Sequence, residues 1–394
     1  MARTKGNVLI GQSGGPTAVI NQSMVGVVEQ ARKDSRVRHV LGARHGVKGM
    51  LENSIVRLDK QPPALLAEIA KQPGAALGSV RKKPTEEECA RIVEFCRAND
   101  VRWLYYIGGN DSAETAQLFE LVAERSTWDM QVRHVPKTID NDLCETDHCP
   151  GYGSAARFVA LALMGDDLDS RALPGVKIDV IMGRDAGWLT AASALARHRD
   201  GDGPHLVYVP ERPFDLDAFT ADVERVRAEL GRCVVAVSEG VRGADGKTVA
   251  VTKEVDAHGN AVLSGSGTLG DFLAAQLRQR LGAKLRVRAD TFGYLQRSFY
   301  GCVSRVDARE ARAVGRFAVR STKDGAARSG SIALQRAPGK AYRVECGLVA
   351  LEKVAHVTKP VPAEFLAAGP DVSAKFLAYA RPLVGELPRP AQLR

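Results

Sequence analysis

The sequence lacks the features of a disulfide-stabilised or membrane-spanning protein. Its seven cysteines are an odd number without any Cys-x-x-Cys spacing, which in a chain of 394 residues argues against a disulfide framework. We expect reduced thiols in the core. No run of about 18 apolar residues occurs, and the N-terminal apolar run, Val8 to Ile10, is far shorter than the hydrophobic region of a signal peptide. A soluble, cytoplasmic protein without a membrane partner is expected.

The composition also argues against nucleic-acid binding. Aromatic residues make up only 6% of the chain, too few for single-strand stacking platforms, and the absence of a Walker A sequence excludes ordinary P-loop nucleotide hydrolases. The net charge of +9 would suit nucleic acid, an anionic membrane or a small polyanion. Because the basic residues are spread along the chain, with the densest cluster at Arg81-Lys82-Lys83, we expect small phosphate compounds and no nucleic acid as partners.

What is present is an alternation of short apolar strands and amphipathic helices. This alternation predicts βαβ units and mainly parallel, doubly wound sheets. A single core stops growing at roughly 250–300 residues, so we expect two Rossmann-like, three-layer α/β domains. The predicted strands are 7–10, 103–107, 131–135, 177–182, 205–209, 233–238 and 285–289, and predicted helices include 18–33, 87–99, 114–124 and 370–379.

Two polar loops about 25 residues apart each follow a predicted strand. The first is Gly108-Gly109-Asn110-Asp111-Ser112, and the second runs from Pro136 through Lys137, Thr138 and Asp140 to Asp142. Glycine admits a phosphate, carboxylates hold Mg²⁺ or accept a proton, and lysine neutralises charge, so the pair predicts a phosphoryl-transfer site. The alternative interpretations are a capped turn for the first loop and an Asx-turn for the second.

Further candidates lie at other strand ends, where open parallel sheets bind their ligands. The loop Gly11 to Pro16 joins the first strand to a helix and suits a phosphate, or is only a tight turn. Arginines fork around phosphate oxygens, although single arginines are more often solvated surface groups. The later candidates are Met182, Gly183, Arg184, Glu239, Arg288, Tyr294 and Arg297.

Taken in order, these segments resemble the phosphofructokinases, specifically the pyrophosphate-dependent kind. The likeness rests on six blocks and one glutamate: Gly14-Gly15, Leu77 to Arg81, Gly108 to Ser112, Pro136 to Asp142, Met182 to Arg184, Glu239, and Gly293 to Arg297. The resemblance implies a two-domain phosphofructokinase fold with residues 1–151 and about 297–346 in a phosphoryl-donor domain. Residues 152–296 form a sugar-phosphate domain with a hairpin insertion over 243–264, predicted from its turn sequences, and 347–394 form a C-terminal extension.

The resemblance also implies a role for each candidate. Asp140 is the general base on the 1-hydroxyl of fructose 6-phosphate, Thr138 and Asp142 position the substrate and Mg²⁺, and Arg184 stabilises the transferred phosphoryl group. The metal would rest on Asp111, because many relatives carry a metal-binding aspartate where Asn110 stands. The sugar phosphate is surrounded by Met182, Gly183, Glu239, Arg288, Tyr294 and Arg297, some from a neighbouring subunit of a homodimer or homotetramer, and pyrophosphate meets Gly14, Gly15, Arg81 and Lys137.

The phosphoryl donor is inferred from two side chains. ATP-using relatives have glycine where Asp111 and Lys137 stand. A carboxylate at 111 would repel the nucleotide's α-phosphate, while the ammonium of Lys137 neutralises pyrophosphate and its leaving group. We therefore expect reversible phosphoryl transfer from pyrophosphate in glycolysis or gluconeogenesis, with an ATP-dependent phosphofructokinase as the alternative.

Other departures and rival functions stay open at the sequence level. The expected arginine near Gly175-Val176-Lys177 is missing, and Lys177 or Arg171 would have to substitute. Gly265 to Gly270 matches G-x-G-x-x-G and precedes Asp290 by about 20 residues, which alone would suggest an NAD-binding oxidoreductase. NAD and lipid kinases lack the Thr138 to Asp142 continuation, and a non-catalytic regulatory relative would lack Asp140.

Overall fold

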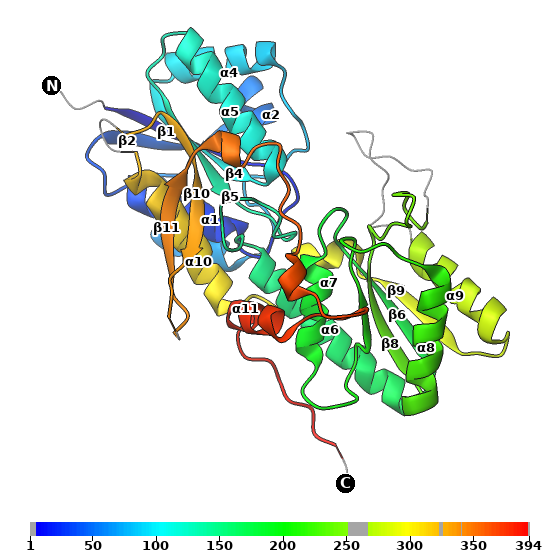
Figure 1. The fold of residues 1–394 in the computed structure, drawn as a ribbon. Coiled ribbons are helices and arrows are strands. Elements are labelled where there is room, and N and C mark those ends of the chain that lie inside the picture. Colours follow the sequence, from blue (N-terminus) through cyan, green and yellow to red (C-terminus); the bar gives the residue numbers. More distant parts are fainter. Residues whose placement is uncertain (1–4, 251–266, 323–325, 340, 393–394) are drawn as a thin grey trace. The chain divides into compact units, whose positions relative to one another are not determined.

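The chain folds into two compact units (Figure 1). The computed structural model describes residues 5–250, 267–322, 326–339 and 341–392. Unit 1 contains residues 1–152 and 305–358, and unit 2 contains residues 153–304 and 359–394. The chain thus crosses between the units three times, and each unit is described by itself below.

Unit 1 is built on a seven-stranded sheet in the order β11-β10-β5-β4-β1-β2-β3. The five central strands are parallel, and the edge strands β3 and β11 are antiparallel to their neighbours. The strands are β1 Gly6–Gln12, β2 Val37–Ala43, β3 Ile55–Arg57, β4 Val101–Gly108, β5 Gln131–Pro136, β10 Ser329–Arg336 and β11 Val344–Val349.

Helices cover both faces of this sheet because successive strand residues are apolar on both sides, as a buried parallel sheet requires. Ile10, Trp103 and Tyr105 pack in one core with α1 and α10, whereas Leu9, Leu104 and Tyr106 pack in a second core with α4 and α5. The helices are α1 Ile20–Ala31, α2 Val47–Leu51, α3 Pro63–Lys71, α4 Glu86–Ala98, α5 Asn110–Arg125, α10 Arg305–Arg320 and the short η3 Leu351–Lys353.

Two glycines allow α1 and α10 to pack in close contact. A Cβ atom at Gly26 would lie 2.3 Å from the Arg312 carbonyl oxygen, and one at Gly315 would lie 2.0 Å from the Ser23 carbonyl oxygen. Real Cβ atoms do not approach oxygen so closely, so a larger residue at either position would push the two helices apart.

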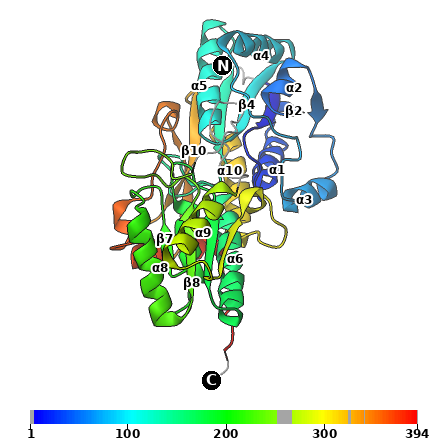
Figure 2. The ribbon, with the colours of Figure 1, turned by 90° about the vertical axis from the view of Figure 1, so that its right-hand side faces the viewer.

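Unit 2 contains a four-stranded parallel sheet in the order β7-β8-β6-β9. Its strands are β6 Val176–Ile181, β7 Leu206–Tyr208, β8 Cys233–Ser238 and β9 Val287–Thr291. Figures 1 and 2 show α8 and α6 on opposite sides of β8, which gives this unit three layers. The helices are α6 Tyr152–Ala172, which begins at the unit boundary, α7 Trp188–Ala192, η1 Ser193–Ala196, α8 Leu216–Leu230, α9 Thr268–Leu281, η2 Gly293–Arg297, η4 Ala363–Phe365 and α11 Ala374–Val384.

The segment from Lys359 onward packs within unit 2 through an aromatic cluster. Phe365, Phe376 and Tyr379 surround Trp188 with ring-centroid distances of 5.5–6.5 Å. Trp188 also donates its indole N–H to the Lys359 carbonyl at 3.0 Å. Burial of these large rings fixes the C-terminal segment to α7.

The predicted α/β fold with mainly parallel sheets is confirmed. The predicted strands lie within three residues of the observed ones and coincide at β8, whereas the helix predicted at 370–379 is α11 at Ala374–Val384, and β2, β3, β10 and β11 were not predicted. Most of the predicted hairpin, residues 251–264, lies outside the described residues. In the described part, Thr248 forms an antiparallel bridge with Arg242, the residue just before the predicted range. No helix in the described ranges combines the length and apolarity needed to cross a bilayer. All seven cysteines are free thiols, and Cys89, Cys96, Cys149 and Cys233 are buried.

Candidate active site

The three predicted phosphate loops of unit 1 lie at one edge of its sheet. They follow β1, β4 and β5, which are adjacent parallel strands, so the residues after each strand lie side by side. Backbone hydrogen bonds join the loops: the Lys137 N–H donates to the Gly108 carbonyl at 2.9 Å, and the Ser13 N–H donates to the Ile107 carbonyl at 2.9 Å.

Lys137 lies directly against the Gly14-Gly15 loop. Its side chain is buried, and Nζ donates to the Gly15 carbonyl at 2.7 Å. A Cβ at Gly14 would stand 3.2 Å from this Nζ, and Gly14 has φ +74°, which glycine adopts without strain. The ammonium and the glycine backbone therefore share one small volume, a combination that suits a phosphate oxygen.

The Leu77 to Arg81 segment contacts the same loop. The Ser79 hydroxyl donates to the Gly14 carbonyl at 2.5 Å, and the Gly14 N–H donates to the Val80 carbonyl at 3.2 Å. Arg81 follows directly and is exposed; within the described residues it makes no ion pair, whereas Lys82 and Lys83 are paired with glutamates. The structure thus leaves the Arg81 charge available beside the Gly14 loop.

Helix α5 begins inside the second loop and carries the predicted metal ligand. Asp111 is exposed in the first turn of α5, where the helix dipole favours a negative charge. The Asn110 Nδ2 donates to Asp142 Oδ2 at 2.8 Å, so its Oδ1 is the opposite, accepting atom, and this oxygen is buried without a hydrogen-bond partner. A buried amide oxygen without a hydrogen-bond partner, next in sequence to the Asp111 carboxylate, is the kind of oxygen donor that a hard cation prefers.

The Asp140 loop is ordered by its own side chains. The Asp140 N–H donates to Thr138 Oγ1 at 3.1 Å, and this hydroxyl lies 3.4 Å from Asp140 Oδ2. Thr138 is buried, whereas Asp140 and Asp142 are half-buried. Together with the Asn110 contact, these bonds bring Thr138, Asp140, Asp142 and the start of α5 into one group.

His134, near the carboxyl end of β5, contacts the end of β4 and the neighbouring strand β10. Burial, with the Lys137 charge as a further cause, lowers the pKa of His134 to about 4, so the ring is neutral at physiological pH. One ring nitrogen contacts the Gly108 carbonyl at 2.9 Å and the other the Ser331 hydroxyl at 2.8 Å. Sequence reasoning did not single out this histidine.

In unit 2, the predicted sugar-phosphate residues gather at the carboxyl ends of β6 and β8. Met182 and Glu239 are buried, and the Gly183 N–H contacts Glu239 Oε1 at 3.5 Å. A Cβ at Gly240 would lie only 1.9 Å from the Arg184 carbonyl oxygen, so the two loops touch through their backbones. Arg184 itself is half-buried.

Helix η2 brings Tyr294 and Arg297 to this strand-end group. Gln296 is 2% exposed and accepts a hydrogen bond from the Met182 N–H at 3.2 Å, which ties η2 to the end of β6. The Arg297 guanidinium lies 4.6 Å from the centroid of the Tyr294 ring. Sequence reasoning missed Gln296 as the residue that makes this connection, although it lies inside the quoted Gly293 to Arg297 block.

Arg288 is the one predicted residue of this set that lies along a strand rather than at its end. It is exposed on β9, three residues before Thr291, or about 10 Å at 3.3 Å per residue. Successive side chains of a strand point to opposite faces, and the buried Val287 leaves Arg288 on the exposed face of β9.

Comparison with known proteins decides the family. The phosphofructokinase family model matches residues 7–321. The chain belongs to the phosphofructokinase family. It is 48% identical over 387 residues to the pyrophosphate–fructose 6-phosphate 1-phosphotransferase of Rhodospirillum rubrum, covering 97% of this chain and 95% of the relative. It is 40% identical to the protein of that name from Xanthomonas campestris, covering 98% and 93%. The crystal structure of a pyrophosphate-dependent phosphofructokinase from Nitrosospira multiformis superposes with a TM-score of 0.86 at 32% identity, covering 98% and 94%.

Lys177 and Arg171, the two possible substitutes for the arginine missing near the sugar phosphate, both form ion pairs in this phosphofructokinase. Lys177 Nζ lies 3.5 Å from Asp166 and 3.9 Å from Asp179, and it also pairs with Asp290. Arg171 pairs with Asp167 at 2.9 Å and Asp202 at 2.7 Å. Both therefore serve the interior of unit 2, and Asp290, the acid of the rival dinucleotide motif, is part of the Lys177 cluster.

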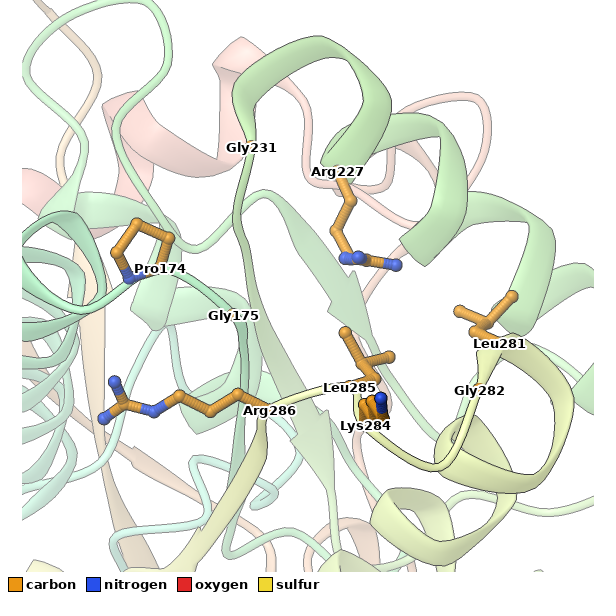
Figure 3. A pocket seen from close by; sticks show the side chains of 9 residues that line it. All are labelled: Pro174, Gly175, Arg227, Gly231, Leu281, Gly282, Lys284, Leu285 and Arg286. Carbon is orange, nitrogen blue, oxygen red and sulfur yellow. The ribbon is translucent and has the colours of Figure 1, made fainter.

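A depression of about 360 Å³ lies at the opposite, amino-terminal edge of the unit 2 sheet (Figure 3). Its basic side chains are Arg227, Lys284 and Arg286. Figure 3 shows Arg227 reaching toward Leu285, whereas the Arg286 side chain runs the other way, past Gly175. Helices α8 and α9 both end at this edge, and cations there offset the negative ends of their dipoles. The basic residues are explained without a ligand.

Proposed function

We propose that this phosphofructokinase transfers a phosphoryl group reversibly between pyrophosphate and the 1-hydroxyl of fructose 6-phosphate, giving fructose 1,6-bisphosphate and phosphate. The observation that carries the proposal is the Lys137 ammonium, buried against the Gly14-Gly15 loop at 2.7 Å from the Gly15 carbonyl. A fixed positive charge at a glycine loop neutralises a donor that offers only phosphate groups. The names of the full-length relatives support the same donor and acceptor.

The acceptor chemistry is assigned to the Asp140 loop. A half-buried carboxylate whose backbone is fixed by Thr138 is suited to accept the proton of the sugar hydroxyl. Thr138 and Asp142 hold the loop and the substrate, and the Arg184 guanidinium stabilises charge on the transferred group. Glu239 accepts hydrogen bonds from sugar hydroxyls, while Tyr294, Arg297 and Arg288 hold the 6-phosphate.

The residues present fit a divalent cation, which we propose to be Mg²⁺. Asn110 Oδ1 is a buried acceptor without a hydrogen-bond partner, and the Asp111 carboxylate follows it in the first turn of α5. These two side chains would hold the ion, and Asp142 would orient Asn110 through its 2.8 Å hydrogen bond. Such an ion neutralises phosphate charge when it is bound.

The deciding experiment compares the two donors. Purified protein is assayed with fructose 6-phosphate and Mg²⁺ in the presence of either pyrophosphate or ATP, with formation of fructose 1,6-bisphosphate measured by a coupled reaction. We expect turnover with pyrophosphate and none above background with ATP. Turnover with ATP and not with pyrophosphate would reject the donor assignment, and turnover with neither would reject the acceptor.

We also propose a homodimer or homotetramer that acts in the cytoplasm. Exposed apolar side chains lie on η2 and directly after it, namely Tyr294, Leu295, Phe299 and Tyr300, and Tyr300 is 72% exposed. A cluster of this kind supports a protein interface. Light scattering of the purified protein gives the mass of the assembly, and a monomer at all concentrations would reject this part of the proposal.

A further inference from the structure

A group of buried and half-buried charges lies next to the Asp140 loop in unit 1. His148 is 2% exposed, and its ring lies between two carboxylates: Nδ1 is 2.8 Å from Asp147 Oδ2 and Nε2 is 2.8 Å from Glu310 Oε2. Arg336 on β10 donates to Asp147 at 3.0 Å, and the Tyr342 hydroxyl donates to Glu310 Oε1 at 2.8 Å. These five residues are called the His148 cluster below.

The hydrogen-bond pattern fixes the protonation state of His148. An ionised carboxylate only accepts hydrogen bonds, so both ring nitrogens must donate and the ring is an imidazolium. Although burial opposes this charge, Asp147 and Glu310 raise the pKa of His148 above its usual value. The cluster then contains two carboxylates, the imidazolium and the Arg336 guanidinium, and its charges balance.

Backbone contacts connect this cluster to the catalytic loop. The Thr138 N–H donates to the Pro150 carbonyl at 3.2 Å, and the Cys149 N–H donates to Asn141 Oδ1 at 2.9 Å. Thr138 and Gly151 also form a parallel bridge. The segment 146–151, which contains His148, therefore supports the residues on both sides of Asp140.

Helix α10 holds that supporting segment at two points one turn apart. Glu310 binds the His148 ring, and Asp307 Oδ1 accepts the Gly151 N–H at 2.8 Å. Asp307 and Glu310 are 3% and 4% exposed, so both contacts are shielded from water. Residues three apart on a helix lie on one face, so α10 can bind both His148 and Gly151 of the segment 146–151.

The loop needs such support because Asn141, directly after Asp140, has φ +56° and is fully buried. Residues other than glycine rarely adopt this conformation, and it persists where surrounding contacts determine it. The Asn141 side chain is itself fixed by the Cys149 N–H, next to His148 in sequence. The orientation of Asp140 thus depends on the segment that His148 anchors.

We propose that His148 is a positioning residue for phosphoryl transfer, acting through its hydrogen bonds to Asp147 and Glu310, which fasten the segment 146–151 to α10 and thereby fix the Asp140 loop. The effect on phosphoryl transfer rests on the proposed function, whereas the anchoring of the loop by His148 does not. It assigns no contact between His148 and a substrate. A displacement of about 1 Å at a reacting group costs roughly 100-fold in rate, which sets the expected size of the effect.

The test uses a variant in which no buried charge is left unpaired. His148→Phe combined with Glu310→Met removes both partners of one ion pair and leaves the Asp147–Arg336 pair intact, a change that buried pairs often tolerate. The matched control is Tyr105→Phe, which removes a buried hydrogen bond of 3.0 Å to Thr322 in the same unit, away from the loops. His148→Gln, which retains a donor without the charge, serves as the conservative variant.

Two readouts separate positioning from folding. For the double variant we expect a kcat about 100-fold lower with a KM for fructose 6-phosphate nearly unchanged, and faster amide hydrogen exchange in peptides covering 138–151. His148→Gln, which leaves the buried Glu310 carboxylate without its cation, should lower kcat and speed exchange at least as much as the double variant. The control should match the wild type on both measures.

Each other outcome overturns the inference. A double variant with wild-type kcat, or one with lower kcat but wild-type exchange in 138–151, would show that His148 does not position the loop. Equal losses in Tyr105→Phe would assign the effect to general destabilisation. If the wild type itself is inactive with both donors, the proposed function fails, and the exchange comparison alone decides whether His148 anchors the loop.

Discussion

Two proposed reacting groups of unit 1, Lys137 and Thr138, lie inside the protein, whereas two proposed binding groups of unit 2, Tyr294 and Arg288, are exposed. Lys137 and Thr138 are 3% and 7% exposed and fixed by hydrogen bonds, while Tyr294 is 52% exposed and Arg288 lies on an edge strand. Groups held in place before the reaction stabilise the transition state without reorganising, and exposed cations mainly attract the substrate. The comparison predicts that changes at Lys137 and in the Asp140 loop lower kcat, and that changes at the cations of unit 2 proposed to hold the 6-phosphate raise KM.

The largest effect is expected at Asp140. Asp140→Ala removes the proposed general base, and kcat should fall by about 10²–10⁴-fold while the KM for fructose 6-phosphate changes little. Steady-state kinetics with pyrophosphate measure both constants. Asp129→Ala, at another acidic position of unit 1 outside the loops, should behave like the wild type. Unaltered turnover in Asp140→Ala would remove this residue from the mechanism.

A smaller effect is expected for the donor-side residues. Asp111→Gly combined with Lys137→Gly removes the carboxylate that repels a nucleotide and the ammonium that neutralises pyrophosphate. Pyrophosphate-dependent kcat/KM should fall by about 100-fold, and ATP should become a measurable donor. Lys83→Ala, an exposed lysine paired with Glu114, is the matched control. ATP use that stays undetectable in the double variant would contradict this account of donor choice.

A change at a phosphate-holding cation of unit 2 should raise KM and leave kcat nearly constant, in contrast to Asp140→Ala. Arg297→Ala removes a cation proposed to hold the 6-phosphate, and a hydrogen bond to a charged group is worth roughly 1.5–3 kcal/mol, so KM should rise by about 10–100-fold with kcat nearly constant. Arg280→Ala on α9, whose side chain pairs with Asp217, is the control. A loss confined to kcat would break the division between the two units.

Much of this arrangement could be predicted from the sequence because local patterns determine it. Apolar runs of strand length followed by polar or glycine-rich loops located seven of the nine parallel strands in the described residues, all except β2 and β10. They placed Gly14, Gly108 and Lys137 at strand ends, where the fold brings them together. Strands that are buried on both faces give such runs regardless of their partners.

The rest depends on contacts between residues far apart in the chain. His148 and Glu310 are separated by 162 positions, and Tyr105 and Thr322 by 217, so no local pattern connects them. Asn110 Nδ2 donates to Asp142. These two residues lie in different loops, which the sequence presents as separate motifs. At the sequence level, Lys177 is a possible substitute for the arginine missing near Gly175. Nothing local indicates that strand β9 and helix α6 place the carboxylates of Asp290 and Asp166 around it.

The buried charges of the two units also differ in balance, which gives the smallest expected effect. The His148 cluster is neutral, but the Lys177 cluster of unit 2 has one ammonium and the three carboxylates of Asp166, Asp179 and Asp290. One oxygen from each carboxylate lies within 4.8 Å of the others. Asp179 is fully buried, and neither of its oxygens accepts a hydrogen bond. Burial, with the charge of Asp166 beside it, raises the pKa of Asp179 well above its usual value.

The raised pKa makes the folded state hold a proton that the unfolded state has released, so the free energy of unfolding falls as pH rises from about 4, the unfolded value, toward the folded pKa. Asp179→Asn keeps the shape and removes the titration. Its Tm should therefore match the wild type at about pH 3, where both states hold the proton, and exceed it by about 2–4 °C at pH 8, as measured by calorimetry. Asp290→Asn, at the exposed member of the cluster, should gain less. A Tm below that of the wild type at both pH values would mean that the Asp179 carboxylate stabilises unit 2, and that the two buried clusters do not differ in the way their charges suggest.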